Sequence, residues 1–209
     1  MRSVNKVTST AILVATGLLV VGAASREMIS NDRHVGAKGH HIAVNHRIMK
    51  MDFSLAKSFP SWSALKGAAS LIVLGTAGAQ HITGGSPTSA PWTTTTIHVE
   101  RVVQGAGAST QTVLVRQLGG VGPDGTLWNS DDFPLLTKDG HYLLFLTPSP
   151  SPAEFYPVGA PQGIFTVSAA GRVSAYNAVA AQVGVAVQDA PLEQIMQAVV
   201  AAPAARVTP

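Results

Sequence analysis

The chain has no cysteine among its 209 residues. This absence excludes disulfide bonds, thiolate metal sites and cysteine nucleophiles. It also excludes the lipoprotein anchor of bacteria, because that anchor is attached through a cysteine. The fold must therefore be stabilised by its own core, and about 150 residues beyond an N-terminal segment are enough for one domain with a proper core.

Charged residues are scarce as well. They make up 12% of the chain, with a net charge of +3, and the share is about half of that in an average protein. From Phe59 onward lysine and arginine are few and scattered. A nucleic-acid-binding domain would carry a basic patch with interleaved aromatic residues on its folded part. We therefore expect no nucleic acid among the partners of this chain.

Basic residues and histidines gather instead between residues 26 and 58. The histidines there are His34, His40, His41 and His46. Their spacing matches no dedicated metal-binding pattern such as HExxH. We interpret them as solvated side chains of a linker, and the sequence predicts no metal site and no cofactor.

The first 25 residues have the pattern of an export segment. Arg2 and Lys6 precede an uninterrupted apolar or small stretch from Ala11 to Ala24, and small residues continue to Ser25. A positive segment, an apolar run and small residues, in that order, are typical of a secretory signal. The run is short for a bilayer, which takes about 20 apolar residues to span. Residues 1–25 are therefore predicted to be a signal peptide or an N-terminal membrane anchor. The protein is expected to be secreted or anchored on the outer face of the cytoplasmic membrane.

The remaining chain divides into a linker over residues 26–58, a β-rich domain over residues 59–203 and a tail over residues 204–209. Period-two alternation and glycine-rich turns predict most of the strands. The run 70–76 is expected to be a strand buried on both faces. Residues 93–103 and 110–118 are expected to form a hairpin, with Ile97, Val99 and Val103 on one face. A further apolar strand is expected over 141–146, and a second hairpin over 163–168 and 172–176.

Two helices are predicted beside these strands. Ser61 is a plausible N-cap for a short helix that presents Trp62, Leu65 and Ala69 on one face. Asp189 is expected to cap a final amphipathic helix. Its apolar residues at helical spacing are Leu192, Ile195, Met196, Val199 and Val200.

No βα units alternate along the chain, so a doubly wound parallel sheet is not expected. The predicted fold class is mainly β. It is a small antiparallel, partly open, OB-like barrel with a short helix before it and a C-terminal amphipathic helix. A β-sandwich is the alternative.

Several segments together resemble a known group of proteins. They are the strand ending in Gly-Thr at residue 76, VERVVQG at 99–105, VLVRQLGG at 113–120, YLLFL at 142–146 and YPVGAPQGIFTV at 156–167. In these segments the chain is similar to uncharacterised small exported β-rich proteins of Gram-positive bacteria, mainly actinomycetes. In strand order only, it is also similar to the barrels of tissue inhibitors of metalloproteases and netrins. Those inhibitors act through an N-terminal cysteine that this chain lacks, so the likeness implies no inhibitory mechanism.

No set of residues reaches the standard of a catalytic site. The nearest cluster for a hydrolase is Ser130, Asp131, Asp132 and His141, but Ser130 is not in a G-x-S-x-G elbow. Asp131 and Asp132 are typical of turns. We therefore assign no catalytic residue.

Aromatic residues in loops are the better functional candidates, because aromatic side chains supply much of the contact energy in binding. The candidate binding residues are Trp92, Trp128, Tyr156, Gln162 and Phe165. The loop between Tyr156 and Phe165 is either a binding rim or a corner of the sheet where glycine permits a tight bend.

Three hypotheses follow. The first is a non-enzymatic exported module that binds a protein, a peptide or a surface polymer of the cell envelope. The second is a cell-envelope hydrolase that uses His141 with Asp131 or Asp132. The third is a structural subunit of an envelope complex that docks through the final helix, with Met196 and Val200 exposed.

Overall fold

The fold is taken from a computed structural model. It describes residues 47–51, 57–105 and 111–203, and the backbone of three short strands before them at 13–15, 18–20 and 25–28. Most of the predicted export segment, the four histidines near residue 40, the turn after residue 105 and the tail from 204 lie outside the described residues. In the described part of the chain, no helix has the length and apolar character needed to cross a membrane.

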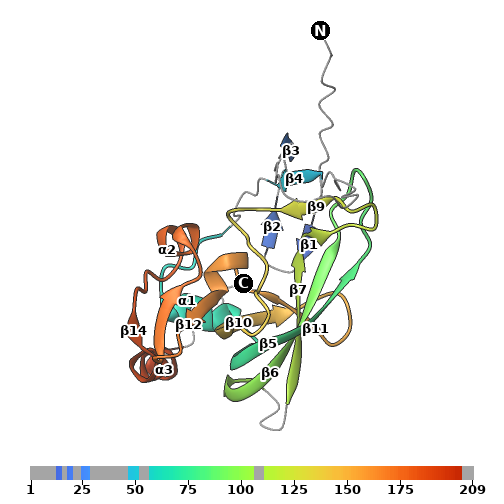
Figure 1. The fold of residues 1–209 in the computed structure, drawn as a ribbon. Coiled ribbons are helices and arrows are strands. Elements are labelled where there is room, and N and C mark those ends of the chain that lie inside the picture. The colour runs from blue at the N-terminus through green and yellow to red at the C-terminus, as the bar shows by residue number, and fades with distance from the viewer. Residues whose placement is uncertain are drawn as a thin grey trace, which may run out of the picture.

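The described chain is mainly β, with three α-helices and one 3-10 helix (Figure 1). The strands are β1 (Leu13–Ala15), β2 (Leu18–Val20), β3 (Ser25–Met28), β4 (Ile48–Met51), β5 (Leu71–Thr83), β6 (Trp92–Gln104), β7 (Thr112–Leu118), β8 (Gly120–Val121), β9 (Leu127–Asn129), β10 (His141–Pro148), β11 (Glu154–Pro157), β12 (Ile164–Val167), β13 (Arg172–Ala175) and β14 (Ala190–Pro191). The helices are α1 (Trp62–Ala68), η1 (Ala160–Gly163), α2 (Ala178–Val183) and α3 (Leu192–Ala201). A mainly β fold with a short helix before it and a helix at its C-terminal end agrees with the prediction.

Five strands of the main sheet are hydrogen-bonded in a ring. β5 pairs with β6, β6 with β7, β7 with β11, β11 with β10, and β10 again with β5. Both predicted hairpins are present as the antiparallel pairs β6–β7 and β12–β13. The β7–β11 pair, however, is parallel. In this pair, β11 returns to β7 from a distant part of the chain, whereas the other pairs of the ring are antiparallel.

Alternating side chains of the strands supply two separate cores. On β5, Val73 belongs to the core inside the ring, whereas Ile72 belongs to the core on the outer side. Leu144 and Phe145 divide in the same way on β10. Successive side chains of a strand point to opposite faces of the sheet, so a strand that is covered on both sides is apolar throughout. The predicted burial of residues 70–76 on both faces is confirmed for residues 71–74.

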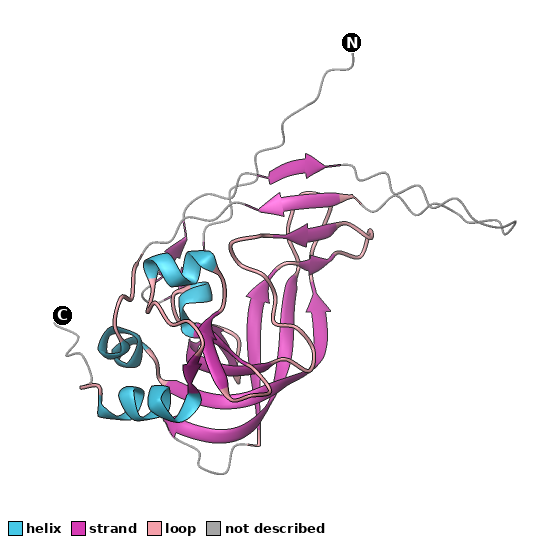
Figure 2. Cartoon of the chain, turned by 60° about the vertical axis from the view of Figure 1, so that its left-hand side comes forward, coloured by secondary structure: helices cyan, strands magenta, loops and turns pink. Residues whose placement is uncertain are grey.

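Helices cover the outer side of the ring at β5 and β10 and pack on the adjoining strand β12. In both views the helices gather on one side of the strands (Figures 1 and 2). Ser61 accepts a hydrogen bond from the Ala64 amide at 3.2 Å and caps α1 as predicted. Trp62 packs against the aromatic rings of Phe145 and Phe165. Helix α3 buries Met196 in the same core.

Irregularities in the pairing of β5 with β6 place Val103 on a different face of the sheet from the one predicted. Val99 and Val102 pack on the core inside the ring, but Val103 packs on the outer core. The β5–β6 pairing slips between Leu74 and Gly75 and again between Ile72 and Val73. Each extra residue on β6 changes which positions face inward. The prediction that Val103 shares a face with Ile97 is therefore wrong.

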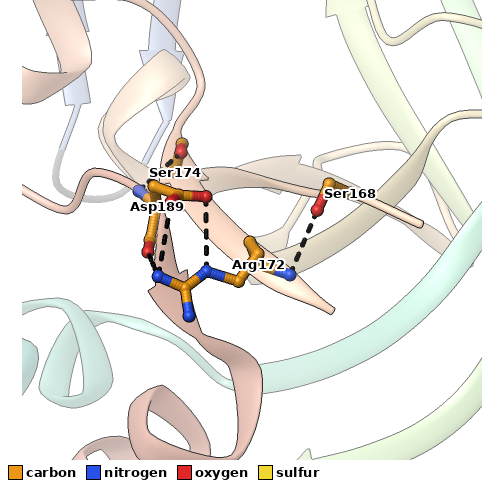
Figure 3. A network of polar contacts seen from close by, with 4 residues as sticks. All are labelled: Ser168, Arg172, Ser174 and Asp189. Carbon is orange, nitrogen blue, oxygen red and sulfur yellow. Dashed lines mark hydrogen bonds and ion pairs between the residues drawn. The ribbon is translucent and has the colours of Figure 1, made fainter. Parts of the chain in front are cut away.

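Asp189 does not cap the final helix. Helix α3 has Pro191 at its N-cap and receives no hydrogen bond from a side chain there. The Asp189 carboxylate instead faces the Arg172 guanidinium, with two nitrogen–oxygen distances of 3.3 Å (Figure 3). The Asp189 amide donates to the hydroxyl of Ser174 at 2.9 Å. Asp189 thus holds the segment before α3 on strand β13.

Part of the predicted linker belongs to the folded structure. Residues 48–51 form β4, which pairs with β3 and with β9 in a second, four-stranded sheet. Met49 and Met51 are buried there against Trp128. Local periodicity did not reveal this strand, because its four residues give too short a pattern to recognise and its partner β9 is distant in sequence.

The segment between β9 and β10 has no regular secondary structure and closes one end of the ring. Leu136 is 1% exposed and packs in the core inside the ring. Side chains of β5, of β7 and of the two residues that follow β13 bind the backbone of this segment. They donate to it from Gln80 (to Leu136 O, 2.6 Å), Gln117 (to Pro134 O, 3.2 Å), Tyr176 (to Leu135 O, 2.6 Å) and Asn177 (to Asp132 O, 2.8 Å). Burial raises the pKa of Tyr176, with nearby Tyr142 adding to the effect, so the hydroxyl of Tyr176 remains a donor.

Candidate functional site

The outer side of β6, β7 and β11 carries an aromatic and polar cluster centred on Arg116. Val113 and Val115 of β7 face the core inside the ring, so Arg116 faces outward by alternation. Its guanidinium carbon lies 4.7 Å from the centroid of the Trp92 ring on β6. The Trp92 and Tyr156 rings are 5.8 Å apart between centroids, at an interplanar angle of 34°. The β6–β7 hairpin and the distant strand β11 thus bring one cation and two aromatic rings together.

Glu154 holds Arg116 in this position. Its carboxylate accepts hydrogen bonds from Nη1 of Arg116 at 2.7 Å and from the hydroxyl of Thr94 at 2.9 Å. The same Nη1 also donates to the hydroxyl of Ser151 at 2.8 Å. The side chains of Arg116 and Glu154 are only 19% and 16% exposed. This partial burial favours a fixed geometry over the loose ion pairs typical of a protein surface.

The surroundings of Glu154 keep it ionised. Burial by itself would raise the pKa of this carboxyl, but the hydrogen bonds from Arg116 and Thr94 and the charge of Arg116 outweigh it, so the pKa is lowered. The cluster therefore contains a paired positive and negative charge at neutral pH. Trp92 and Tyr156 are half-buried, so part of each side chain remains available for contact. This arrangement is suited to binding, because rings and neutralised charges can contact a ligand without a large desolvation cost.

The other three candidate binding residues are buried. Trp128 is 3% exposed and packs with Met49 and Met51. The expectation that Trp128 lies exposed on a loop is wrong, because Met49 and Met51 of the neighbouring strand β4, which the sequence did not reveal, pack against it. Phe165 is 1% exposed and packs edge to face on Phe145.

Gln162 is also buried and has a structural role. Its Oε1 accepts from the Phe59 amide at 2.8 Å, and its Nε2 donates to the carbonyls of Lys57 at 2.9 Å and Gly159 at 3.3 Å. A side chain of η1 thereby fixes the backbone that leads into α1. The chain turns tightly here. A Cβ atom on Gly163 would lie 2.6 Å from the Val158 carbonyl oxygen. Of the two interpretations of the loop after Tyr156, the structure supports the tight corner.

The residues of the hydrolase hypothesis have other partners. Nε2 of His141 lies 3.0 Å from Oε2 of Glu100, at ion-pair distance but without hydrogen-bond geometry. Asp131 pairs with Lys50 at 2.7 Å. The Ser130 side chain is buried and accepts from the Asp132 amide at 3.3 Å, as in a turn. In the described part of the chain, the charged partner of His141 is therefore Glu100 and neither of the two aspartates.

Within the described ranges, no group of three or more histidine, aspartate or glutamate residues is placed to hold a metal ion.

The docking hypothesis expected Met196 and Val200 to be exposed together. Val200 is 61% exposed, but Met196 is 2% exposed in the outer core, so that expectation is wrong for Met196.

Sequence reasoning did not select Arg116, Glu154 or Thr94. The alternation of side chains along β7 would have been enough to predict that Arg116 lies on the outer face of the sheet. Glu154 lies in a proline-rich stretch that gives no sign of a strand, and its pairing with β7 is parallel and non-local. Only the tertiary structure unites these residues with Trp92 and Tyr156.

Comparison of this chain with protein-family models, with curated protein sequences and with solved structures finds no match.

Proposed function

We propose that this chain is a non-enzymatic binding module that acts outside the cytoplasm, and that it binds a protein, peptide or surface polymer of the cell envelope. It is exported by its first 25 residues and is either released or kept at the outer face of the membrane. The resemblance to small exported proteins of Gram-positive bacteria agrees with this location. The binding surface is the cluster of Trp92, Arg116, Glu154 and Tyr156.

One observation carries this proposal. The Arg116 guanidinium lies 4.7 Å from the Trp92 ring, and the Trp92 and Tyr156 rings are 5.8 Å apart, so the three groups are in continuous contact. None of these three residues belongs to the outer core that the helices cover. Aromatic and arginine side chains are enriched among the residues that contribute most to binding. Their geometry is fixed before binding by Glu154, which reduces the entropy lost on association.

Photo-cross-linking in the producing cells tests the surface. A photo-reactive phenylalanine analogue replaces Tyr156, with the same analogue at exposed Gln188 as the control. We expect position 156 to trap one dominant envelope component that position 188 does not trap. Identical products at both positions, or no product at 156 from folded protein, would contradict the proposed surface.

Cell fractionation tests the location separately. We expect the protein in the medium or the membrane fraction. Full-length protein confined to the cytosol would contradict export while leaving the cross-linking result at Tyr156 to be judged by itself.

A further inference from the structure

A row of four side chains crosses four neighbouring strands on the side of the sheet that carries the aromatic cluster. His81 of β5 is directly opposite Thr94 of β6, and Thr94 is directly opposite Arg116 of β7. Directly opposite residues of an antiparallel pair lie on the same face. The parallel pairing of β11 with β7 places Tyr156 beside Arg116. Since neighbouring strands are about 4.8 Å apart, the row is about 14 Å long.

The contacts of the preceding residue agree with this position of His81. Gln80 donates to the hydroxyl of Thr95 at 3.2 Å and to the carbonyl of Leu136 at 2.6 Å. Leu136 lies inside the ring, so Gln80 faces inward and His81 faces outward by alternation. His81 is exposed. The outer face therefore extends beyond the cluster around Arg116 and includes the imidazole of His81.

The fixed charges beside this row neutralise each other. Arg116 and Glu154 form an ion pair at 2.7 Å. The four strands β5, β6, β7 and β11 contain no lysine. A strongly acidic or strongly basic ligand is held by complementary charge, and this row offers it little. A neutral ligand is favoured for this reason.

The large exposed apolar side chains lie elsewhere. In the described part of the chain they are Ile82, Val121 and Val200. Ile82 follows His81 and so faces the opposite side of the sheet, while Val121 is in β8 and Val200 is in α3. An amphipathic helix or an apolar peptide binds through several apolar anchors. The row is therefore poorly suited to such a partner.

We propose that the row, together with the Trp92 ring, binds a neutral polysaccharide chain that lies across the four strands. A sugar ring has C–H groups that pack on aromatic rings, and its hydroxyl groups donate and accept hydrogen bonds. Trp92 and Tyr156 supply the aromatic contacts. The imidazole of His81 both donates and accepts. The polysaccharide is then the surface polymer of the proposed function, on which this assignment rests.

Isothermal titration calorimetry of the full chain, in the form that the producing cells accumulate, tests the proposal. The probe is neutral wall polysaccharide from the same cells, freed of protein and of charged polymers. We expect His81→Ala to weaken binding about tenfold, because a hydrogen bond to the sugar is lost. His81→Gln keeps a donor and an acceptor and is expected to stay within about threefold of the unmodified chain.

His98→Ala is the matched control. His98 is an exposed histidine of β6, four residues along the strand from Thr94 and thus outside the row. We expect this variant to bind like the unmodified chain if the polysaccharide lies across the strands. A ligand that ran along β6 would make His98→Ala as harmful as His81→Ala, and that result would overturn the proposed direction.

Ionic strength separates a neutral ligand from a charged one. We expect the affinity to change by less than about twofold between about 0.05 M and 0.5 M NaCl, because salt screens only interactions between charges. A strong dependence on salt would overturn the neutral character of the ligand.

The remaining outcomes separate this proposal from the proposed function. Absence of polysaccharide binding by the folded chain, or full binding by His81→Ala, would overturn the proposal. A protein trapped through position 156 would also overturn it, but would leave the proposed binding surface in place. Polysaccharide binding that Trp92→Ala leaves unchanged would contradict the surface itself.

Discussion

The guanidinium of Arg116 lies over the ring of Trp92 at 4.7 Å, and the same guanidinium donates to Glu154 at 2.7 Å. The ring attracts the cation through its electron-rich face, while the carboxylate fixes its direction. Arg116 thus links a charge pair on β7 and β11 to an aromatic side chain on β6. The proposed binding surface is rigid for this reason, and its integrity depends on Glu154 remaining ionised.

Stability at acid pH is expected to depend on Glu154. Its pKa in the folded chain is below the ordinary value of 4.5, so ionised Glu154 stabilises the fold above that value. The contribution is lost as the pH falls below 4.5 and through the lowered pKa. Glu154→Gln is expected to cost about 1–2 kcal/mol at pH 7, with the difference from the unmodified chain shrinking as the pH falls.

Urea unfolding at a series of pH values between 7 and 3 measures this difference. Asp131→Asn is the control, since its ion pair with Lys50 has a carboxylate that is 71% exposed and is expected to contribute about 0.5 kcal/mol or less. A loss for Glu154→Gln that stays constant down to pH 3 would count against the role of the ionised carboxylate.

Gln162→Met tests whether the buried side-chain amide of Gln162 fixes the backbone that leads into α1. Methionine keeps most of the volume but leaves the Phe59 amide and the Lys57 carbonyl without their partner in Gln162. We expect a loss of about 2–4 kcal/mol in the free energy of unfolding, because buried backbone groups would be unsatisfied. Gln188→Met, at an exposed position, is expected to stay within about 0.5 kcal/mol of the unmodified chain. Equal effects of the two substitutions in chemical denaturation would refute this role.

Leu136→Ala tests the segment that closes the ring. Leu136 is 1% exposed inside the ring, and truncation of such a residue costs about 2–5 kcal/mol. The neighbouring Leu135 is only half-buried, so Leu135→Ala is expected to cost less, in proportion to its smaller buried apolar area. Thermal and urea unfolding compare the two. If Leu135→Ala proves the more damaging, the segment is not held by its inward-facing leucine.

The local pattern of the sequence was sufficient for much of the fold. Alternating β-branched residues around glycine-rich turns predicted the β6–β7 and β12–β13 hairpins, because strand formation and turn geometry depend on neighbouring residues. Ser61 was found in the same way, since a cap acts on amides only three residues away. The predicted export segment lies mostly outside the described residues and stays a prediction.

The tertiary structure decided which strands meet and therefore where the site lies. Three contacts join residues that are distant in sequence. They are the parallel pairing of β11 with β7, the packing of Trp128 against the methionines of β4, and the pairing of Asp189 with Arg172. The periodicity of the sequence does not predict such contacts. The alternation of residues along a strand shows which face of the sheet a side chain occupies, but not which other element packs on that face. The sequence by itself therefore determined a mainly β chain with apolar strands and two flanking helices. Packing alone buried Trp128, Gln162 and Phe165 and left Trp92 and Tyr156 beside Arg116 on the outer side of the ring.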